Sequence, residues 1–307
     1  MRMKRVISRI GAVFAAVAVL VGVTAQIAVA SPFSGAGIQI VGGTDATTPW
    51  TVALQAPTGD DPFTCGGTLI ASQWVVTAAH CMSSPDFPQG IAPGYKARIG
   101  SLQWNSGGIL ATVDQTFVEP HYQGLPVNDI ALVKLTSPVR SRVFPMGKVG
   151  PAGTKLLVAG WGTICDLDIL DPVCHRDIPI NLQQLTERRL PNEQCSLVDP
   201  DFGELFHPES MFCAVSADGQ PRQACFGDSG SPVLQQKYGI WTVVGVVIAD
   251  GDDDGGPRAH LCSTSPAGGA GSVMVTSIAP HAPWIIQTLL ANNDGAAAQS
   301  IQSTSSL

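Results

Sequence analysis

Charged side chains are scarce in this sequence: they make up 13% of its 307 residues, whereas 45% are hydrophobic. This composition excludes a chain that is disordered throughout, and it is enough to bury one large core or two small ones. The sequence also lacks clusters of Lys and Arg, and its formal charge is −7. A general nucleic-acid binder is therefore excluded, because phosphate neutralisation needs clustered cations.

Long apolar helical patterns and repeats of fixed period are also rare or absent. With 33 Gly and 23 Pro, the sequence instead alternates short β-type runs with turn clusters, which favours an all-β fold. Six of the predicted strands are Thr64–Ile70, Trp74–Thr77, Ile130–Leu135, Lys155–Ala159, Ile240–Ala249 and Ser272–Ile278.

The first 30 residues have the three parts of a secretory signal peptide. They are a basic start with four Lys or Arg, an uncharged run from Gly11 to Val23, and the exit Ala28-Val29-Ala30. An uncleaved membrane anchor is the alternative, but the run is short for a bilayer span of about 20 residues. We expect cleavage after Ala30, which removes four positive charges and changes the formal charge from −7 to −11.

No C-x-x-C pair occurs among the eight cysteines, and no His lies beside them in a zinc pattern. This argues against the alternative of a structural zinc site. An even number of cysteines in an exported chain instead predicts four disulfides.

The C-terminal part contains one helical pattern. Pro283 to Leu290 begins with Pro and has apolar residues at helical spacing, which predicts an amphipathic helix that packs on the body of the protein. Residues 291–307 are rich in Ala, Ser, Gln and Asn, so we expect a disordered tail there.

Three motifs carry the residues for nucleophilic catalysis. A serine hydroxyl needs a base to take its proton, and the base needs a carboxylate to fix its tautomer. The sequence has Thr77-Ala78-Ala79-His80-Cys81, Asn128-Asp129-Ile130-Ala131-Leu132 and Gly227-Asp228-Ser229-Gly230-Ser231-Pro232. Singly, His80 could be a core histidine, Asp129 a strand-edge cap and Ser229 a turn residue.

Together the motifs resemble the chymotrypsin/trypsin family of serine proteases, in its chain order of His, Asp and Ser. The resemblance covers residues 40–290 and suggests a secreted bacterial member. It implies two six-stranded antiparallel β-barrels with the active site between them, a C-terminal helix, and a catalytic triad of His80, Asp129 and Ser229. It also implies an oxyanion hole made by the backbone N–H groups of Gly227 and Ser229.

The resemblance further implies an activation step. Cleavage before Ile40 would remove residues 31–39 as a propeptide and free an α-ammonium that pairs with Asp228. An ordinary first strand is the alternative for Ile40-Val41-Gly42-Gly43. Gln39 stands where many relatives have Arg or Lys, so an activating protease with trypsin-like preference is not expected. The implied disulfides are Cys65–Cys81, Cys195–Cys213 and Cys225–Cys262, which leaves Cys165–Cys174 for a local loop.

The substrate pocket departs from the family pattern. Gln223, six residues before the nucleophile, stands at the pocket floor where a trypsin-like enzyme has Asp, so basic specificity is not supported. Ile248-Ala249-Asp250 replaces a Ser-Trp-Gly-like strand, and Ile248 lacks the hydroxyl that often supports the triad aspartate. We assign the pocket to Gln223, Ala224, Ile248, Ala249 and Asp250.

We therefore predict a secreted, extracellular serine endopeptidase that is made as a zymogen, has no cofactor and requires no metal. The acidic loop at residues 251–256 is interpreted as a solvated loop. The expected partners are protein or peptide substrates and an activating protease, with no nucleic acid and no stable membrane anchor, and the chain is expected to be a monomer. The alternative is a binding or scaffold module with a protease fold and little or no activity.

Overall fold

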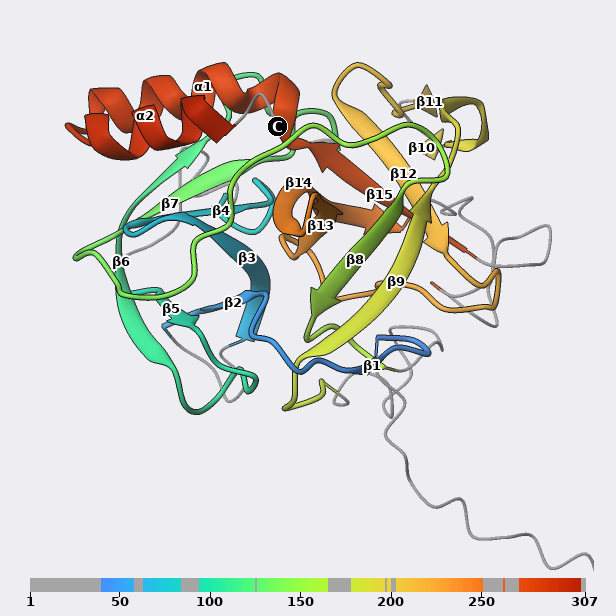
Figure 1. Ribbon diagram of the computed structural model, residues 1–307, viewed down its shortest axis with the longest axis horizontal. Helices are drawn as coiled ribbons and strands as arrows, with labels where there is room; N and C mark the ends of the chain where they lie inside the picture. Colours follow the sequence, from blue (N-terminus) through green and yellow to red (C-terminus); the bar gives the residue numbers. More distant parts are fainter. Residues whose placement is uncertain are drawn as a thin grey trace, which may run out of the picture. The chain divides into compact units, whose positions relative to one another are not determined.

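The computed structural model describes residues 40–57, 63–83, 94–124, 126–164, 178–196, 198–199, 203–250, 262 and 271–304. The expected signal peptide, the propeptide, the acidic loop and the Cys165–Cys174 bridge lie outside the described residues. Strands dominate the described part, as predicted, and they form two antiparallel β-barrels (Figure 1).

The first barrel closes in the order β2-β3-β4-β7-β6-β5. Its strands are β2 (Val52–Gln55), β3 (Phe63–Ala71), β4 (Trp74–Thr77), β5 (Lys96–Ile99), β6 (Ile109–Val118) and β7 (Ala131–Leu135). All four side chains of β2 and of β4 are buried. The runs of Val, Leu and Ile therefore mark strands that are covered on both faces rather than half-exposed ones.

The second barrel closes because β8 pairs with both β9 and β13. Its strands are β8 (Lys155–Gly160), β9 (Gln183–Arg189), β12 (Met211–Ser216), β13 (Pro232–Lys237), β14 (Ile240–Asp250) and β15 (Ser272–Ser277). The short β1 (Thr44–Asp45) pairs with β9 at the edge of this sheet. Outside the barrels lie the 3₁₀ helix η2 (Asn192–Gln194) and the small hairpin of β10 (Val198–Asp199) and β11 (Gly203–Glu204).

Side chains of residues 50 and 51 connect the two barrels. Trp50 Nε1 donates a hydrogen bond to the side-chain oxygen of Gln184 at 3.1 Å, and Thr51 Oγ1 donates to the carbonyl of Ala159 at 2.6 Å. The Trp50 ring also meets the edge of Trp241 on β14, with 5.2 Å between the ring centroids. These contacts fix the segment before β2 against the second barrel.

The C-terminal helix α1 (Ile278–Ala291) begins five residues earlier than the sequence pattern predicts, so Pro283 lies inside it rather than at its start. The proline removes one N–H of the helical ladder. The helix forms nevertheless because one of its faces is buried against the body of the protein, through Ile278, His281, Ala282, Ile285 and Leu289.

The structure differs from the disordered tail expected for residues 291–307, because a second helix, α2 (Gly295–Thr304), lies beside α1 (Figure 1). Ala298 and Ile301 are buried in the main hydrophobic core, and α2 packs against β3. Asp294 begins the helix: its Oδ1 accepts a hydrogen bond from the Ala297 N–H, and its Oδ2 accepts one from Trp74 Nε1 at 3.0 Å. The burial of Ala298 and Ile301, together with the cap formed by Asp294, therefore stabilises a helix in a segment that has few large apolar residues.

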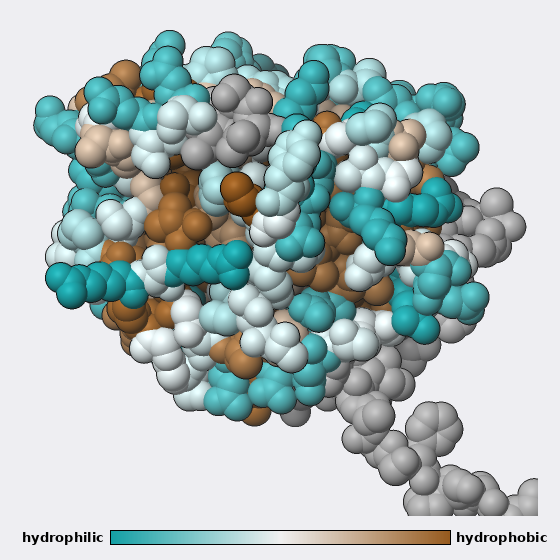
Figure 2. Space-filling model, in the orientation of Figure 1, coloured by the Kyte–Doolittle hydropathy of each residue, from teal (hydrophilic) through white to brown (hydrophobic). Residues whose placement is uncertain are grey.

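The surface seen in Figure 2 has hydrophobic residues in separate patches among hydrophilic ones. Within the described residues, no helix combines the length and the apolar character needed to cross a lipid bilayer.

The bond between Asp294 and Trp74 gives a test of the terminal anchor. Asp294→Ala should lower the free energy of unfolding by about 1.5–3 kcal/mol, because a charged acceptor and a helix cap are lost together. Asp294→Asn keeps one of the two acceptor oxygens, so it retains one of the bonds and should cost less. Urea unfolding of both variants measures the difference, and equal stability of Asp294→Ala and the wild type would contradict the anchor.

Candidate functional site

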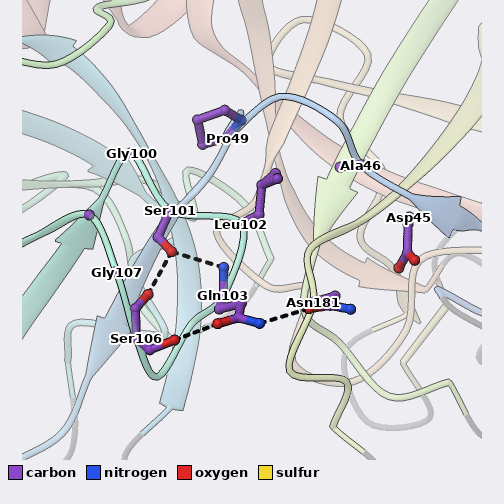
Figure 3. A pocket seen from close by; sticks show the side chains of 11 residues that line it. Asp45, Ala46, Pro49, Gly100, Ser101, Leu102, Gln103, Ser106, Gly107 and Asn181 are labelled. Carbon is purple, nitrogen blue, oxygen red and sulfur yellow. Dashed lines mark hydrogen bonds between the residues drawn. The ribbon is translucent and has the colours of Figure 1, made fainter.

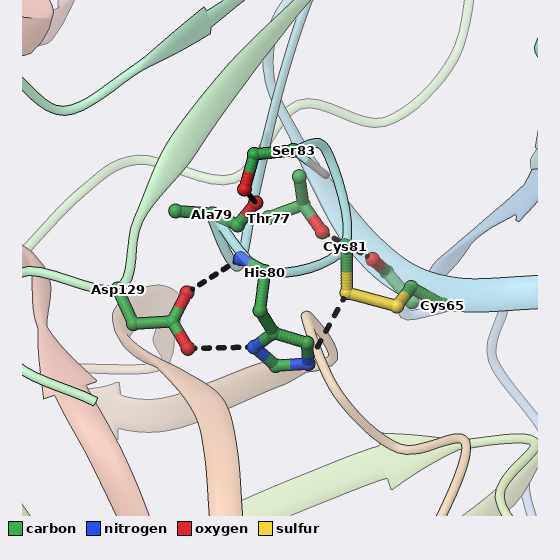
Figure 4. Close-up of a disulfide and its surroundings, with 8 residues drawn as sticks. Cys65, Thr77, Ala79, His80, Cys81, Ser83 and Asp129 are labelled. Atoms are coloured by element: carbon green, nitrogen blue, oxygen red, sulfur yellow. Dashed lines mark hydrogen bonds and ion pairs between the residues drawn. A yellow bond between two sulfur atoms is a disulfide. The ribbon is translucent and has the colours of Figure 1, made fainter. Parts of the chain in front are cut away.

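His80 and Asp129 lie at the ends of two neighbouring strands of the first barrel. His80 follows β4, Asp129 precedes β7, and these strands pair from Trp74 to Thr77. His80 Nδ1 is 2.6 Å from Asp129 Oδ2, and the His80 backbone N–H donates to the other carboxylate oxygen at 2.9 Å (Figure 4). The Asp129 carboxylate therefore holds both the ring and the backbone of His80, while 35% of the histidine side chain stays exposed.

The environment of His80 raises its pKa above the ordinary 6.5. Burial alone lowers the pKa, but the hydrogen bond that the ring donates to Asp129 and the negative charge of that carboxylate together outweigh it. This arrangement favours an imidazole that takes up a proton readily. It suits a general base.

Asp129 has neighbours that its own motif does not predict. Asn128 adopts a left-handed backbone with φ of 57°, and its side-chain amide oxygen is 3.2 Å from Nε2 of the buried His281 on α1. Tyr122 lies close enough for the charge of Asp129 to add to the effect of burial, and together they raise the pKa of Tyr122 to about 12. The contact between Asn128 and His281 could have been suspected from the sequence, because Asn is one of the residues that adopt a left-handed backbone.

Backbone hydrogen bonds bring the turn with Ser229 to the first barrel. The Ser229 carbonyl accepts a hydrogen bond from the Gly66 N–H at 2.8 Å, and the Gly66 carbonyl accepts one from Thr77 Oγ1 at 2.7 Å. A side chain on Gly230 would collide with Thr77, three residues before His80. The glycine after Ser229 thus permits the close approach of the two motifs.

Gly227 and Asp228 shape the same turn. Gly227 has φ of 90°, a conformation that favours glycine. The Asp228 carboxylate is completely buried and accepts hydrogen bonds from the Gly162 N–H at 2.8 Å and the Cys225 N–H at 3.0 Å. Burial raises the pKa of Asp228 to about 6, although these two bonds act in the opposite direction.

The glycines of Gly160-Trp161-Gly162 make room for this carboxylate. A Cβ atom at either glycine would collide with the Asp228 side chain. The motif therefore has a steric cause that the sequence alone does not reveal, because the two segments are 66 residues apart.

The chain near Ile40 lies against the segment that leads to Asp228. Ile40 is completely buried, and the Val41 carbonyl accepts a hydrogen bond from the Gln223 N–H at 3.1 Å. Val41 also packs with the disulfide of Cys225 and Cys262. Ile40 and Asp228 are thus both buried, and the residue after Ile40 is bonded to the segment that leads to Asp228.

The predicted pocket residues are largely buried. Gln223 Nε2 donates to the carbonyls of Gly271 at 2.9 Å and Ala214 at 3.4 Å, and its Oε1 accepts from the Ala224 N–H at 2.8 Å. Its polar atoms are therefore engaged by backbone groups. Ile248 is 6% exposed and lies at a bulge of β14, where the pairing with β15 skips from Val247 to Ala249. The side chain of Asp250 lies outside the described residues.

The structure has three of the four expected disulfides: Cys65–Cys81, Cys195–Cys213 and Cys225–Cys262. The first of them joins β3 to the residue after His80 (Figure 4). Of the residues that the structure describes, Cys65, His80 and Cys81 form the only group of three possible metal ligands that lie close together. Both sulfurs are oxidised in the disulfide, so they offer no thiolate to a metal ion.

A cavity of about 620 Å³ opens elsewhere, between the turn at Ser101–Gly108 and Asn181 (Figure 3). Ser101 Oγ donates to the Ser106 carbonyl at 2.6 Å, and Gln103 Nε2 donates to the Asn181 side chain at 3.2 Å. Among the described lining residues Asp45 is the only charged one, and none of them is paired with a histidine. The lining thus offers no activated nucleophile.

One buried acid has no counterpart among the predicted site residues. Glu187 on β9 is completely buried, and neither of its carboxyl oxygens has a hydrogen-bond partner among the described residues. In β9 the residues at alternate positions Gln183, Leu185 and Glu187 are buried. The strand pattern could have identified this acid as pointing inward.

Comparisons with known proteins agree with this geometry. The family model described as Trypsin matches residues 40–263. A trypsin of Sarcophaga bullata is 33% identical over 218 residues, which cover 68% of this chain and 78% of the relative. Trypsin theta of Drosophila melanogaster is 31% identical over 225 residues, which cover 70% of this chain and 78% of the relative.

The contact between Asp129 and His80 predicts a change in titration. Asp129→Asn should lower the pKa of His80, because the carboxylate charge is lost while the burial remains. NMR titration of the histidine ring resonances measures this. Glu209→Gln is the control, since it removes the exposed carboxylate 3.1 Å from His207 and should leave His80 unchanged. An unaltered His80 pKa in Asp129→Asn would contradict this role of the pair.

Proposed function

Because the chain belongs to the trypsin family of serine proteases, we propose that it is a secreted serine endopeptidase with Ser229 as nucleophile, His80 as general base and Asp129 as the residue that orients the histidine. The observation that carries this proposal is the 2.6 Å contact between His80 and Asp129. It is supported by the bond between Gly66 and Ser229, which brings the serine turn to the barrel of His80.

The proposed reaction is acyl transfer. His80 Nε2 takes the Ser229 proton as Oγ attacks the scissile carbonyl carbon, and the Asp129 carboxylate stabilises the imidazolium that forms. The backbone N–H groups of Gly227 and Ser229 stabilise the oxyanion. The imidazolium then gives its proton to the leaving amine, and a water molecule activated by the same histidine hydrolyses the acyl-enzyme.

The proposed enzyme is made as a zymogen. Cleavage before Ile40 creates an α-ammonium, and the buried Asp228 carboxylate is its partner. The burial of Ile40 and the contact of Val41 with Gln223 support this step. Gln39 precedes the cleaved bond, so the activating protease is one that accepts Gln rather than a basic residue.

We further propose export through the signal peptide at residues 1–30, with protein or peptide substrates outside the cell. The substrate preference is for neutral rather than basic side chains. Gln223 carries no charge, and its amide is held by the backbone of Ala214, Gly271 and Ala224, so it offers no counter-ion to a substrate Arg or Lys.

A fluorophosphonate probe tests the reaction. Protein whose N-terminus has been sequenced as Ile40 should be labelled, and Ser229→Ala should abolish labelling and lower kcat by about 10⁶-fold. The exposed Ser137→Ala serves as the matched control and should be labelled like the wild type. Absence of labelling in correctly processed protein would support the binding module instead, and full activity of a chain that begins at Ser31 would overturn the zymogen proposal.

Cleavage of a peptide library tests the preference. Neutral residues should dominate before the cleaved bond, because the buried amide of Gln223 presents no charge. Gln223→Leu should leave this preference unchanged yet lower the free energy of unfolding by about 1–3 kcal/mol, because the carbonyls of Ala214 and Gly271 lose a donor. A strong preference of the wild type for Arg or Lys would show that this interpretation of the pocket is wrong.

A further inference from the structure

The buried Glu187 carboxyl lies inside the second barrel without a partner. It is 0% exposed, and neither oxygen accepts a hydrogen bond from a described residue. Carboxyl groups are rarely buried in this way, because an unpaired buried polar group costs about 1–3 kcal/mol. A buried carboxyl without a partner suggests that a positively charged group binds it in another state of the protein, such as the cleaved one.

The strand pairing places the start of the protease domain beside this acid. Thr44 on β1 faces Gln184 on β9, and Asp45 faces Gln183, with the strands antiparallel. The chain before Thr44 therefore runs back toward Ile40 while β9 runs forward toward Glu187. Gly42 and Gly43 line one groove with Leu185, Thr186 and Ser216. Ser216 on β12 is in turn the direct cross-strand neighbour of Glu187.

The segment that carries Asp228 also contacts the start of the protease domain. The segment from Gln223 to Asp228 contacts Val41 through the Gln223 N–H. Burial raises the pKa of Glu187 to about 8, and the nearby charge of Asp228 adds to this rise. Ile40, Glu187 and Asp228 are each 0% exposed, so a charge on any of them is shielded from water.

No described cation is paired with Glu187: Arg222, which lines the groove at Gly42, lies 3.4 Å from the Asp218 carboxylate instead. The neighbour of Glu187 on β8 is Leu156, and on β12 it is Ser216, whose hydroxyl donates to Asp218. On β9 itself Arg188 is exposed, and the Arg189 guanidinium donates to the Gly150 carbonyl and the Asn192 side chain. Among the described residues, the titratable group whose charge acts on Glu187 is Asp228, in the turn before β13.

We propose that Glu187 is a second carboxylate for the α-ammonium of Ile40 and acts with Asp228 as a positioning residue for the active conformation. This inference rests on the proposed cleavage before Ile40. The ammonium has three donors, so it can bond to both acids at once. A single carboxylate would leave part of its hydrogen-bonding capacity unused in a buried site.

The proposal fixes the proton balance of activation. At pH 7 the uncleaved chain has Asp228 mostly ionised and Glu187 protonated. Hydrolysis breaks the bond between the Gln39 carbonyl carbon and the Ile40 nitrogen, and water provides the atoms for a carboxylate and an ammonium without net proton release. The ammonium then lowers the pKa of Glu187, whose proton leaves to solvent. Activation should thus release about one proton per molecule.

Proton release can be measured in a chain that cannot digest itself. In a Ser229→Ala background, residues 35–39 are replaced by an enteropeptidase site and the cleavage is followed in a pH-stat at pH 7. The parent should release about one proton more than Glu187→Gln, which cannot ionise. The exposed Glu193→Gln is the matched control and should behave like the parent. No proton release by the parent overturns the proposal, even if the Glu187 variant fails to fold.

Catalytically competent protein gives a second readout. Processed Glu187→Gln, sequenced to begin at Ile40, should lose fluorophosphonate labelling at a pH about 1 unit lower than the wild type, because the ammonium deprotonates more easily beside one carboxylate than beside two. If that variant loses labelling at the same alkaline pH as the wild type, the role of Glu187 is refuted, while the zymogen proposal is unaffected. Full labelling of uncleaved wild type, in contrast, refutes the zymogen proposal. A basic substrate preference that Glu187→Gln removes would assign the acid to the substrate pocket and overturn the inference.

Discussion

The buried Asp228 carboxylate is the interaction on which the arrangement of the site depends. It accepts hydrogen bonds from Gly162 and Cys225, and it forces glycine at positions 160 and 162. These bonds bind the end of β8 to the turn that carries Ser229. A buried charge with fixed backbone donors cannot move without losing them, so the position of Ser229 follows from the position of its neighbour.

In the first barrel, Asp129 has the corresponding role. Asp129 holds the ring and the backbone of His80, and the Cys65–Cys81 disulfide fixes the next residue to β3. The Gly66 N–H, one residue beyond Cys65, donates to Ser229. One short stretch of β3 thus touches both halves of the site, which explains how motifs from separate barrels keep their register.

The six strands named from local signals in the sequence are all present, and they make up half of the twelve barrel strands. Trp74–Thr77 matches β4 at both ends, and the runs at Lys155, Ile240 and Ser272 begin where β8, β14 and β15 begin. The pattern failed where tertiary contacts override composition. The segment after Leu290 looked too polar to fold, yet Asp294 bonds to Trp74, 220 residues away in the sequence.

The candidate site shows the same division. The motifs around His80, Asp129 and Ser229 predict which residues carry the chemistry, because each motif is local. The packing of Asp228 against Gly160 and Gly162, and the inward position of Glu187, depend on contacts between distant segments. Spacing in the sequence does not encode those contacts, so only the alternating pattern of β9 hinted at the second acid.

The terminal helices connect the two barrels in a way that bears on biosynthesis. α1 continues from β15 of the second barrel, whereas α2 is bonded through Asp294 to β4, the strand that leads to His80. Residues 278–304 are the last of the described chain to leave the ribosome. The strand that leads to His80 therefore gains the bond to Asp294 only after residues 278–304 have been synthesised, and a shorter growing chain holds the His80 and Ser229 segments without it.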